Sequence, residues 1–250
     1  MSSIQQTVYR YGKSFNTHDF IKVLAIVIMI IDHVGDYIFP DNHWLRLIGR
    51  IGLPMWYFLI GYVNKLRMNK FLIVYGILLS CSGSFLYHKL WIDILLTFIV
   101  CQVLLHHFPV ERISTLWRWV FFLLLQVVNA LLYSHVEYGA LSIMFVYSAR
   151  MVAIKDPQAP FWFGLAHIVF FIWQIMAFPY LAQTTLLYSF AFLTLGVYLL
   201  LLYYQQKVLP CPRVLLFPLL LISRYSLHIY FYHLIFLQSI WYFLLKPQTM

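Results

Sequence analysis

Residues 21–39 read IKVLAIVIMIIDHVGDYIF, an apolar run interrupted by Lys22 at its start and by Asp32, His33 and Asp36 near its end. A bilayer core requires about 20 apolar residues per helix, so this run predicts a membrane-spanning helix over residues 20–39. Each ionisable side chain inside such a span costs roughly 2.5–3.5 kcal/mol on insertion scales. Three of them close together indicate a functional cluster.

The rest of the chain has the same character. Hydrophobic residues make up 63% of its 250 residues and charged residues only 10%, with a mean hydropathy of +0.81. Soluble domains carry roughly 25% charged residues. Aromatic residues reach 20%, and many lie at the ends of apolar runs, where their rings favour the headgroup zone. The composition therefore predicts an all-α integral membrane protein.

Further apolar runs follow the first one along the chain. They cover residues 44–63, 70–87, 90–106, 116–133, 138–154, 161–178 and 185–204. The last apolar stretch, residues 214–245, is too long for one simple span and predicts a short re-entrant piece followed by a helix. We expect about nine transmembrane helices, within a range of about eight to ten. They form a single membrane domain over residues 20–245, after an N-terminal segment of residues 1–19.

The basic residues predict the orientation. With a cytoplasmic N-terminus, twelve Lys and Arg residues fall inside and four outside, with Arg224 left unassigned, which is a clear positive-inside bias. The inner set is Arg10, Lys13, Lys22, Lys65, Arg67, Lys70, Arg112, Arg118, Arg150, Lys155, Lys207 and Arg213, and the outer set is Arg46, Arg50, Lys89 and Lys246. The net charge of +9 thus reflects topology, and no nucleic-acid partner is expected.

The first helix carries two adjacent polar stripes. Asp32 and Asp36 are four residues apart, as are His33 and Tyr37. A carboxylate near a histidine raises its basicity and fixes its tautomer, as a general base requires.

The second apolar run, WLRLIGRIGLPMWYFLIGY at residues 44–62, places Arg46 and Arg50 on one stripe, and Pro54 is able to kink it. A turn centred between residues 41 and 42 brings Arg50 to the depth of His33, where it can pair with Asp32 or Asp36. A purely structural ion-pair set at the outer interface is the alternative interpretation.

The late segment SRYSLHIYFYH, residues 223–233, carries a third group. Ser226, Tyr230 and His233 stand at i, i+4 and i+7, which places them on one polar stripe, whereas His228 lies on another face. Such a stripe contacts either a substrate or neighbouring helices. The cysteines Cys81, Cys101 and Cys211 show no paired spacing, so neither a disulfide framework nor a zinc site is expected.

The segments IKVLAIVIMIIDH and GRIGLPMWYFLIGY resemble the TraX family of membrane proteins, typified by the conjugative pilin N-acetylase. The residues that carry the resemblance are Asp32, His33, Gly49, Arg50, Pro54 and the segment 223–233. The resemblance covers nearly the whole length of the chain. It also implies kinship with transmembrane acyltransferases, whose first helix carries a basic residue eleven positions before a histidine. Lys22 and His33 have this spacing, about 16 Å apart along one helix face. Position 22 is Lys, whereas the wider class usually has Arg.

The resemblance implies acetyl transfer from acetyl-CoA, the co-substrate, in the bacterial inner membrane. His33 would act as the base, with Asp32 or Asp36 orienting it, and Arg50 would stabilise the thioester oxygen. No metal is required. The residues expected to attract the CoA phosphates are Lys22, Lys65, Arg67 and Lys70, and those expected to contact the acceptor are Tyr37, Arg46, Ser226, Tyr230 and His233.

The acceptor stays open at this point. The resemblance implies a pilin N-terminal amine, and an envelope glycan is the second class of acceptor, which would make the protein a polysaccharide O-acetyltransferase. A proton-coupled transporter would also use membrane-embedded acids and histidine, but it predicts internal pseudo-symmetry that the sequence does not show. An assembly scaffold would leave Asp32 and His33 unexplained.

Overall fold

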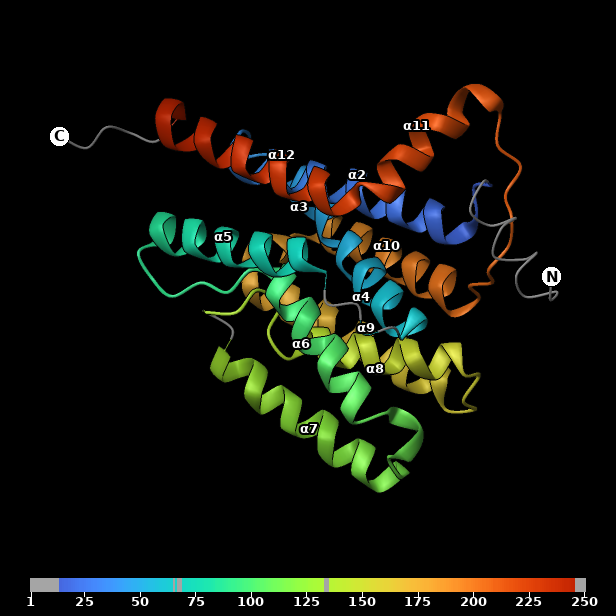
Figure 1. The fold of residues 1–250 in the computed structure, drawn as a ribbon. Helices are drawn as coiled ribbons and strands as arrows, with labels where there is room; N and C mark the ends of the chain where they lie inside the picture. Colours follow the sequence, from blue (N-terminus) through green and yellow to red (C-terminus); the bar gives the residue numbers. More distant parts are fainter. Residues whose placement is uncertain (1–13, 65, 67–68, 133–134, 246–250) are drawn as a thin grey trace. The chain divides into compact units, whose positions relative to one another are not determined.

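The computed structural model describes residues 14–64, 66, 69–132 and 135–245, and all regular structure within them is helical apart from two isolated β-bridges (Figure 1). The all-α prediction is confirmed. The α-helices are α2 (Thr17–Tyr37), α3 (His43–Arg50), α4 (Gly52–Val63), α5 (Lys70–Tyr87), α6 (Ile94–His107), α7 (Thr115–Leu132), α8 (Leu141–Ala153), α9 (Ala159–Ala177), α10 (Thr184–Leu202), α11 (Arg213–Arg224) and α12 (Ser226–Ile240). Short turns η1 (Val110–Arg112), η2 (Pro179–Ala182) and the π-helical η3 (Trp241–Leu245) complete them.

Five helices of the described chain are long and apolar enough to cross a membrane. They are α5, α7, α9, α10 and the continuous helix Ser226–Leu244 formed by α12 and η3. Large apolar side chains on these helices face outward, including Leu123 at 64% exposed and Phe192 at 75%. Exposed apolar side chains on helices of this length and hydropathy are typical of surfaces that face lipid. The protein is therefore a membrane protein, while the nine spans and their orientation stay predictions.

The chain packs as two compact units. Unit 1 comprises Met1–Met55 and Tyr203–Met250, and unit 2 comprises Trp56–Leu202. The boundary falls within α4, inside the region for which the sequence predicted a single membrane domain.

Unit 1 is built around α2, which packs against α3, α11 and α12. Asn16 and Asp19 form a capping box at the start of α2, so this helix begins before the predicted residue 20. The Ser223 hydroxyl donates to Asp19 Oδ1 at 2.6 Å and ties the end of α11 to the same turn. The last apolar stretch forms two helices that are separated at Tyr225, while the predicted re-entrant character of the first stays a prediction. Figure 1 shows α11 and α12 diverging at a sharp bend.

The predicted helix 44–63 is two helices, α3 and α4, that meet at Ile51. Pro54 explains the position of the break. A proline has no N–H to donate to the carbonyl one turn earlier, here that of Arg50, and its ring crowds that carbonyl. The interruption therefore begins one turn before the proline and turns the arginine-bearing segment into a short helix of its own.

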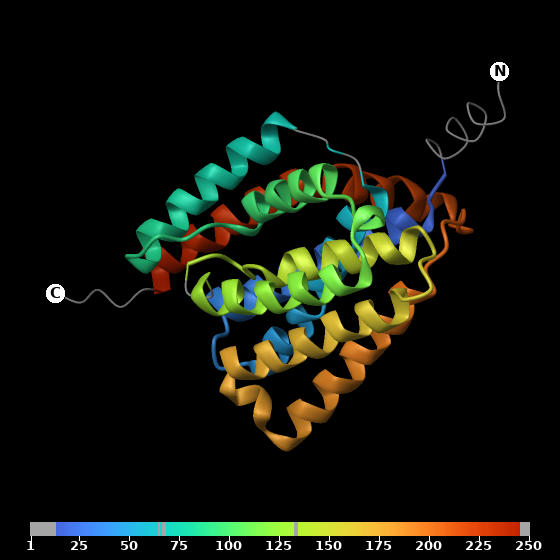
Figure 2. The same cartoon turned by 90° about the horizontal axis from the view of Figure 1, so that it is seen from below.

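Unit 2 is a bundle in which α8 packs against α6, α7 and α9, α10 packs against α9, and α5 against α6. Figure 2 shows α9 and α10 as an antiparallel pair joined through η2. Helix α6 begins at Ile94, later than the predicted residue 90, because the Asp93 carboxylate caps it by accepting from the Leu95 N–H at 2.9 Å.

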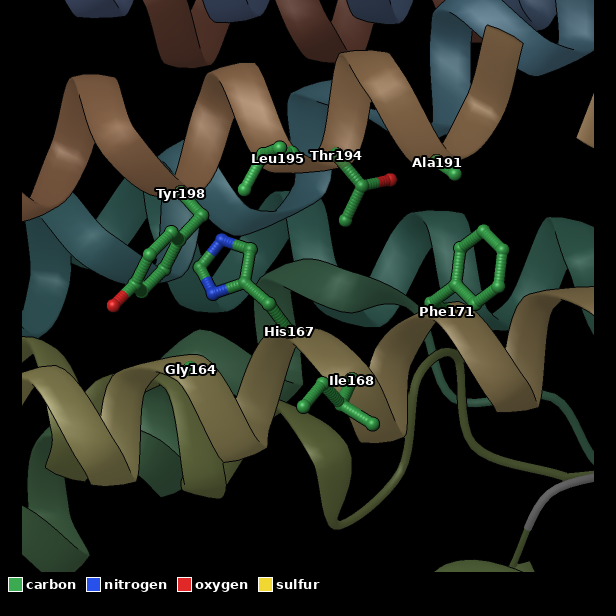
Figure 3. Close-up of a pocket in the computed structure, with 8 residues that line it drawn as sticks. All are labelled: Gly164, His167, Ile168, Phe171, Ala191, Thr194, Leu195 and Tyr198. Carbon is green, nitrogen blue, oxygen red and sulfur yellow. The ribbon is translucent and has the colours of Figure 1, made fainter. Parts of the chain in front are cut away.

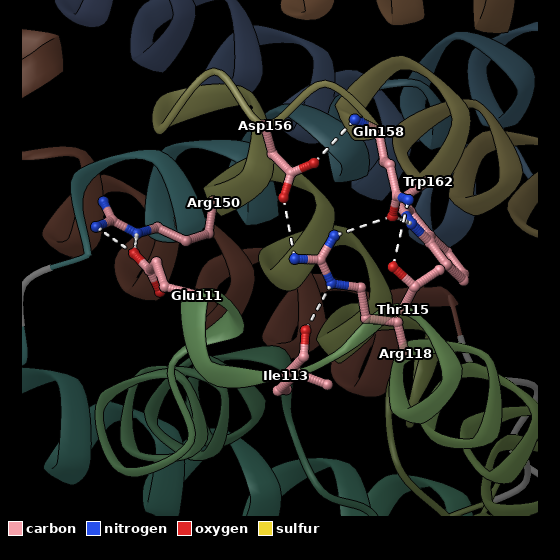
Figure 4. Close-up of polar contacts among 8 residues, drawn as sticks. All are labelled: Glu111, Ile113, Thr115, Arg118, Arg150, Asp156, Gln158 and Trp162. Carbon is pink, nitrogen blue, oxygen red and sulfur yellow. Dashed lines mark hydrogen bonds and ion pairs between the residues drawn. The ribbon is translucent and has the colours of Figure 1, made fainter.

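A polar network joins two connections at one end of unit 2 (Figure 4). Arg118 Nη2 lies 3.0 Å from Asp156 Oδ2, and Arg118 Nη1 donates to Gln158 Oε1 at 3.1 Å. Arg150 Nη2 lies 2.6 Å from Glu111 Oε1. The α6–α7 and α8–α9 connections thus share one end of the unit, in keeping with the prediction that both lie on the same side of the membrane.

Candidate functional site

Three glycines in unit 1 allow the backbones of α2, α3 and α4 to approach closely. A Cβ added at Gly49 would overlap Asp32, and one at Gly35 would lie 2.8 Å from Leu45 Cβ. A Cβ at Gly52 would lie 2.8 Å from Ile28 Cγ2. Contacts this short are not tolerated in a packed interior. The glycines therefore place the arginines of α3 directly against the acidic turn of α2.

The acids of α2 and the arginines of α3 form an ion-pair cluster. Arg46 Nη1 lies 3.0 Å from Asp32 Oδ1 and also donates to the Asp32 backbone carbonyl, while Arg46 Nη2 lies 3.1 Å from Asp36 Oδ1. Arg50 Nε is 3.6 Å from Asp32 Oδ1. The side chains of Asp32 and Arg46 are each 9% exposed and that of Asp36 is 37% exposed. Asp32 is thus the buried centre of the cluster, and Asp36 is its accessible edge.

His33, the next residue along α2, contacts α12 instead. Its Nδ1 lies 2.8 Å from His233 Nε2, and the two rings are 5.0 Å apart at an interplanar angle of 19°. His233 Nδ1 lies 2.7 Å from the Ile229 carbonyl oxygen. A carbonyl only accepts, so the proton of a neutral His233 sits on Nδ1 and its Nε2 accepts. His33 Nδ1 must then be the donor, which leaves the lone pair of His33 Nε2 available as a base.

Aromatic side chains surround the histidine pair. The Tyr230 ring lies 5.9 Å from that of His33, and the Tyr37 ring lies 6.5 Å away. The Gln238 amide donates to the Tyr37 hydroxyl at 3.3 Å, which adds a second polar contact between α12 and α2. Ser226 is buried in the first turn of α12, one turn before Tyr230. The polar stripe predicted for this helix therefore faces α2 at two of its three positions.

The ion-pair cluster and the histidine pair differ from the predicted arrangement in one respect. Asp32 and Asp36 pair with arginines, and the hydrogen-bond partner of the His33 imidazole is His233 rather than a carboxylate. Arg50 lies beside Asp32, one of the two acids with which the hairpin register allows it to pair. The described residues contain no group of three or more His, Cys, Asp or Glu side chains placed to hold a metal ion.

The structure describes two of the four residues predicted to attract the CoA phosphates. Lys22 is half-buried in the second turn of α2, about three turns before His33. Lys70 is the exposed first residue of α5 in unit 2, with its ammonium 5.5 Å from the centre of the Phe71 ring. Lys65 and Arg67 lie outside the described residues.

Comparison with known proteins places this arrangement in a family. Residues 17–241, from the first turn of α2 to the end of α12, match the family model described as "TraX protein". The chain belongs to the TraX family. This TraX chain is also 26% identical over 235 residues to an uncharacterized protein of Rickettsia prowazekii (strain Madrid E), a match that covers 90% of this chain and 92% of that protein. No solved structure matches it.

The contact between His33 and His233 is the feature of this TraX-family site that sequence reasoning missed. Both residues were expected in the site, but in different roles and 200 residues apart. The i, i+4, i+7 spacing shows that His233 lies on a polar stripe, and it contains no information about which helix that stripe meets. The buried tyrosine–glutamine contact beside it was also not predicted.

Proposed function

We propose that this protein is a membrane-embedded acyltransferase that moves an acetyl group from acetyl-CoA to an amine. The observation that carries the proposal is the histidine pair, because a hydrogen bond from His33 Nδ1 to His233 Nε2 leaves His33 Nε2 unprotonated and ready to accept a proton. The arginine–carboxylate cluster begins at the preceding residue of the same helix. A base beside a guanidinium is the combination that acyl transfer from a thioester needs.

The reaction follows from these groups. A neutral amine attacks the carbonyl carbon of the thioester, and His33 Nε2 takes the proton that the nitrogen loses as the C–N bond forms. The C–S bond then breaks, and the departing CoA thiolate receives that proton from His33. The products are an acetylated amine and free CoA thiol. His33 returns to its starting tautomer, held by His233.

Arg50 is assigned to the developing negative charge on the thioester oxygen. Arg46 is held at 3.0 and 3.1 Å by the two carboxylates of α2, which makes it a structural clamp. Arg50 lies farther from Asp32, with its Nε 3.6 Å from Asp32 Oδ1. A preorganised donor of this kind typically contributes a factor of about 10²–10³ to the rate of acyl transfer.

The substrates approach from the two sides of the membrane in this proposal. With a cytoplasmic N-terminus in the bacterial inner membrane, acetyl-CoA arrives from the inside, and Lys22, Lys65, Arg67 and Lys70 attract its phosphates. Tyr37, Tyr230 and Ser226 contact the acceptor. A pilin N-terminal amine is the first acceptor to test, and a hydroxyl of an envelope glycan is the second.

The test uses the purified full-length protein in lipid nanodiscs. Acetyl-labelled acetyl-CoA is added with a peptide bearing a free N-terminal amine or with membrane extract, and both free CoA thiol and labelled product are measured. His33→Ala should lower the rate by about 10²–10⁴. His228→Ala is the matched control, because His228 lies on another face of α12. A folded His33→Ala protein that transfers acetyl at the unmodified rate would refute the proposal.

One observation also supports a proton-coupled transporter. A pair of histidines, with His33 buried, His233 half-buried and their nitrogens 2.8 Å apart, is a suitable step in a proton relay. The same purified protein, reconstituted in liposomes with a pH gradient, separates the two functions. Solute uptake or proton flux without release of CoA thiol would favour the transporter, whereas CoA release that requires an acceptor but no gradient favours the enzyme.

A further inference from the structure

A second polar feature lies in unit 2, in a pocket of about 390 Å³ between α9 and α10 (Figure 3). Figure 3 shows the imidazole of His167 pointing from α9 toward α10, with Tyr198 and Thr194 on either side of it and Phe171 farther along α9. Ligand pockets in proteins generally have volumes of about 300–1,000 Å³, so this one is large enough for a small molecule.

Two buried polar atoms in this pocket have no hydrogen-bond partner among the described residues. They are His167 Nε2 and Thr194 Oγ1, on side chains that are only 4% and 7% exposed. A threonine inside a helix commonly donates to a carbonyl one turn earlier, but Thr194 does not. Burying a polar group without a partner costs about 1–3 kcal/mol, so a pair in one pocket requires an explanation.

The hydrogen bonds of His167 determine what it can recognise. Its Nδ1 lies 2.8 Å from the Phe163 carbonyl oxygen, which only accepts, so the proton of the neutral ring sits on Nδ1. His167 Nε2 is therefore an acceptor that requires a donor. The Thr194 hydroxyl can donate. A ligand hydroxyl can donate to His167 Nε2, and the Thr194 hydroxyl is a second polar group that lines the same pocket.

We propose that this pocket binds a neutral, membrane-dissolved alcohol through its hydroxyl and the hydrocarbon chain next to it. The described lining residues include none that carries a charge, so a carboxylate or ammonium head would be buried without compensation. The remaining lining, with Phe171 and Leu195, is apolar. A 150 Å³ cavity holds benzene, so the pocket has room for about fifteen carbon atoms.

The pocket is accessible from the lipid side of the bundle. Ile168 and Leu195 line it and are nevertheless 59% and 53% exposed. Both lie on helices that are long and apolar enough to cross a membrane. A molecule dissolved in the bilayer therefore reaches the pocket laterally, without passing through water. This inference is independent of acetyl transfer, because the pocket lies wholly within unit 2 and the histidine pair within unit 1.

Photolabelling tests the proposal on the full-length protein in nanodiscs. The probe is a dodecanol that carries a diazirine on its chain, and labelled peptides are identified by mass spectrometry. We expect saturable labelling within residues 164–171 and 191–198, displaced by dodecanol at roughly tenfold lower concentration than by dodecane. Thr194→Val keeps the shape of the side chain and should lower this preference. Thr185→Val, an exposed substitution on the same helix, should leave it unchanged.

His167→Leu is the second variant, and a folded His167→Leu protein should lose the preference for the alcohol. If this variant does not fold, Thr194→Val alone provides the test. Equal displacement by dodecanol and dodecane would overturn the proposal, because the hydroxyl would then not be recognised. Labelling outside α9 and α10 would overturn it as well.

Discussion

Replacing Arg46 with methionine should destabilise the protein by about 3 kcal/mol. The substitution keeps an unbranched side chain of similar bulk and removes the guanidinium that bridges Asp32 and Asp36. Breaking a buried ion pair costs about 3–5 kcal/mol, and Asp32 is buried at 9% exposure. Arg50 Nε, 3.6 Å from Asp32 Oδ1, still compensates part of the charge left on Asp32. The expected loss of stability therefore lies at the lower end of this range. Loss of the ion pair with the more exposed Asp36 adds less than about 1 kcal/mol to this destabilisation.

The measurement is the free energy of unfolding of the full-length protein in mixed micelles, titrated with a denaturing detergent. A double-mutant cycle assigns the energy, because Asp32→Asn in the Arg46→Met background removes the stranded charge and should restore most of the lost stability. Asp36→Asn in the same background should change it by less than about 0.5 kcal/mol. A loss below about 1 kcal/mol for Arg46→Met, or equal rescue by both asparagines, would contradict the burial argument.

Three further predictions follow from single contacts. His233→Leu leaves the imidazole on α2 without its partner, so the acetyl-transfer rate should fall about tenfold and its pH profile should shift, whereas a purely structural role would leave the profile in place. Gly49→Ala should destabilise the protein by about 1–3 kcal/mol, because the added Cβ overlaps Asp32. Gly196→Ala is the control, since a Cβ there meets nothing within 4 Å and should not destabilise the protein. Equal melting temperatures for the two variants would refute the close approach of α3 to α2 at Gly49. Arg118→Met should lower the free energy of unfolding by about 2 kcal/mol, and an unchanged value would show that its ion pair is not structural.

Local features of the chain could be predicted from sequence because their causes are local. The run at residues 70–87 coincides with α5, and the last apolar stretch divides into two helices as its excess length predicts. Pro54 breaks the second apolar run, although the break begins one turn earlier than the proline itself. Apolar length, helical period and proline each act over a single turn or a single span, so no knowledge of neighbouring helices is needed.

Part of the site could also be predicted from sequence, for a related reason. The turn at residues 41–42 and the helical rise limit where two consecutive helices can meet, which is enough to place Arg50 near Asp32 or Asp36, and the structure selects Asp32. The residue types of the cluster were likewise visible, since ionisable groups are rare in apolar runs. This reasoning could not predict which side chains pair. In the structure Arg46 pairs with both carboxylates, and His33 hydrogen-bonds to His233.

The sequence by itself determined that this is an all-helical membrane protein of the TraX family with its ionisable residues concentrated in the first two apolar runs. Only the tertiary structure decided that His33 meets His233, and that His167 and Thr194 line one pocket between α9 and α10. Hydropathy and periodicity depend on neighbours within one helix. The pairing of helices far apart in the chain depends instead on packing shape, which glycines such as Gly49 set through contacts that appear only once the helices are assembled.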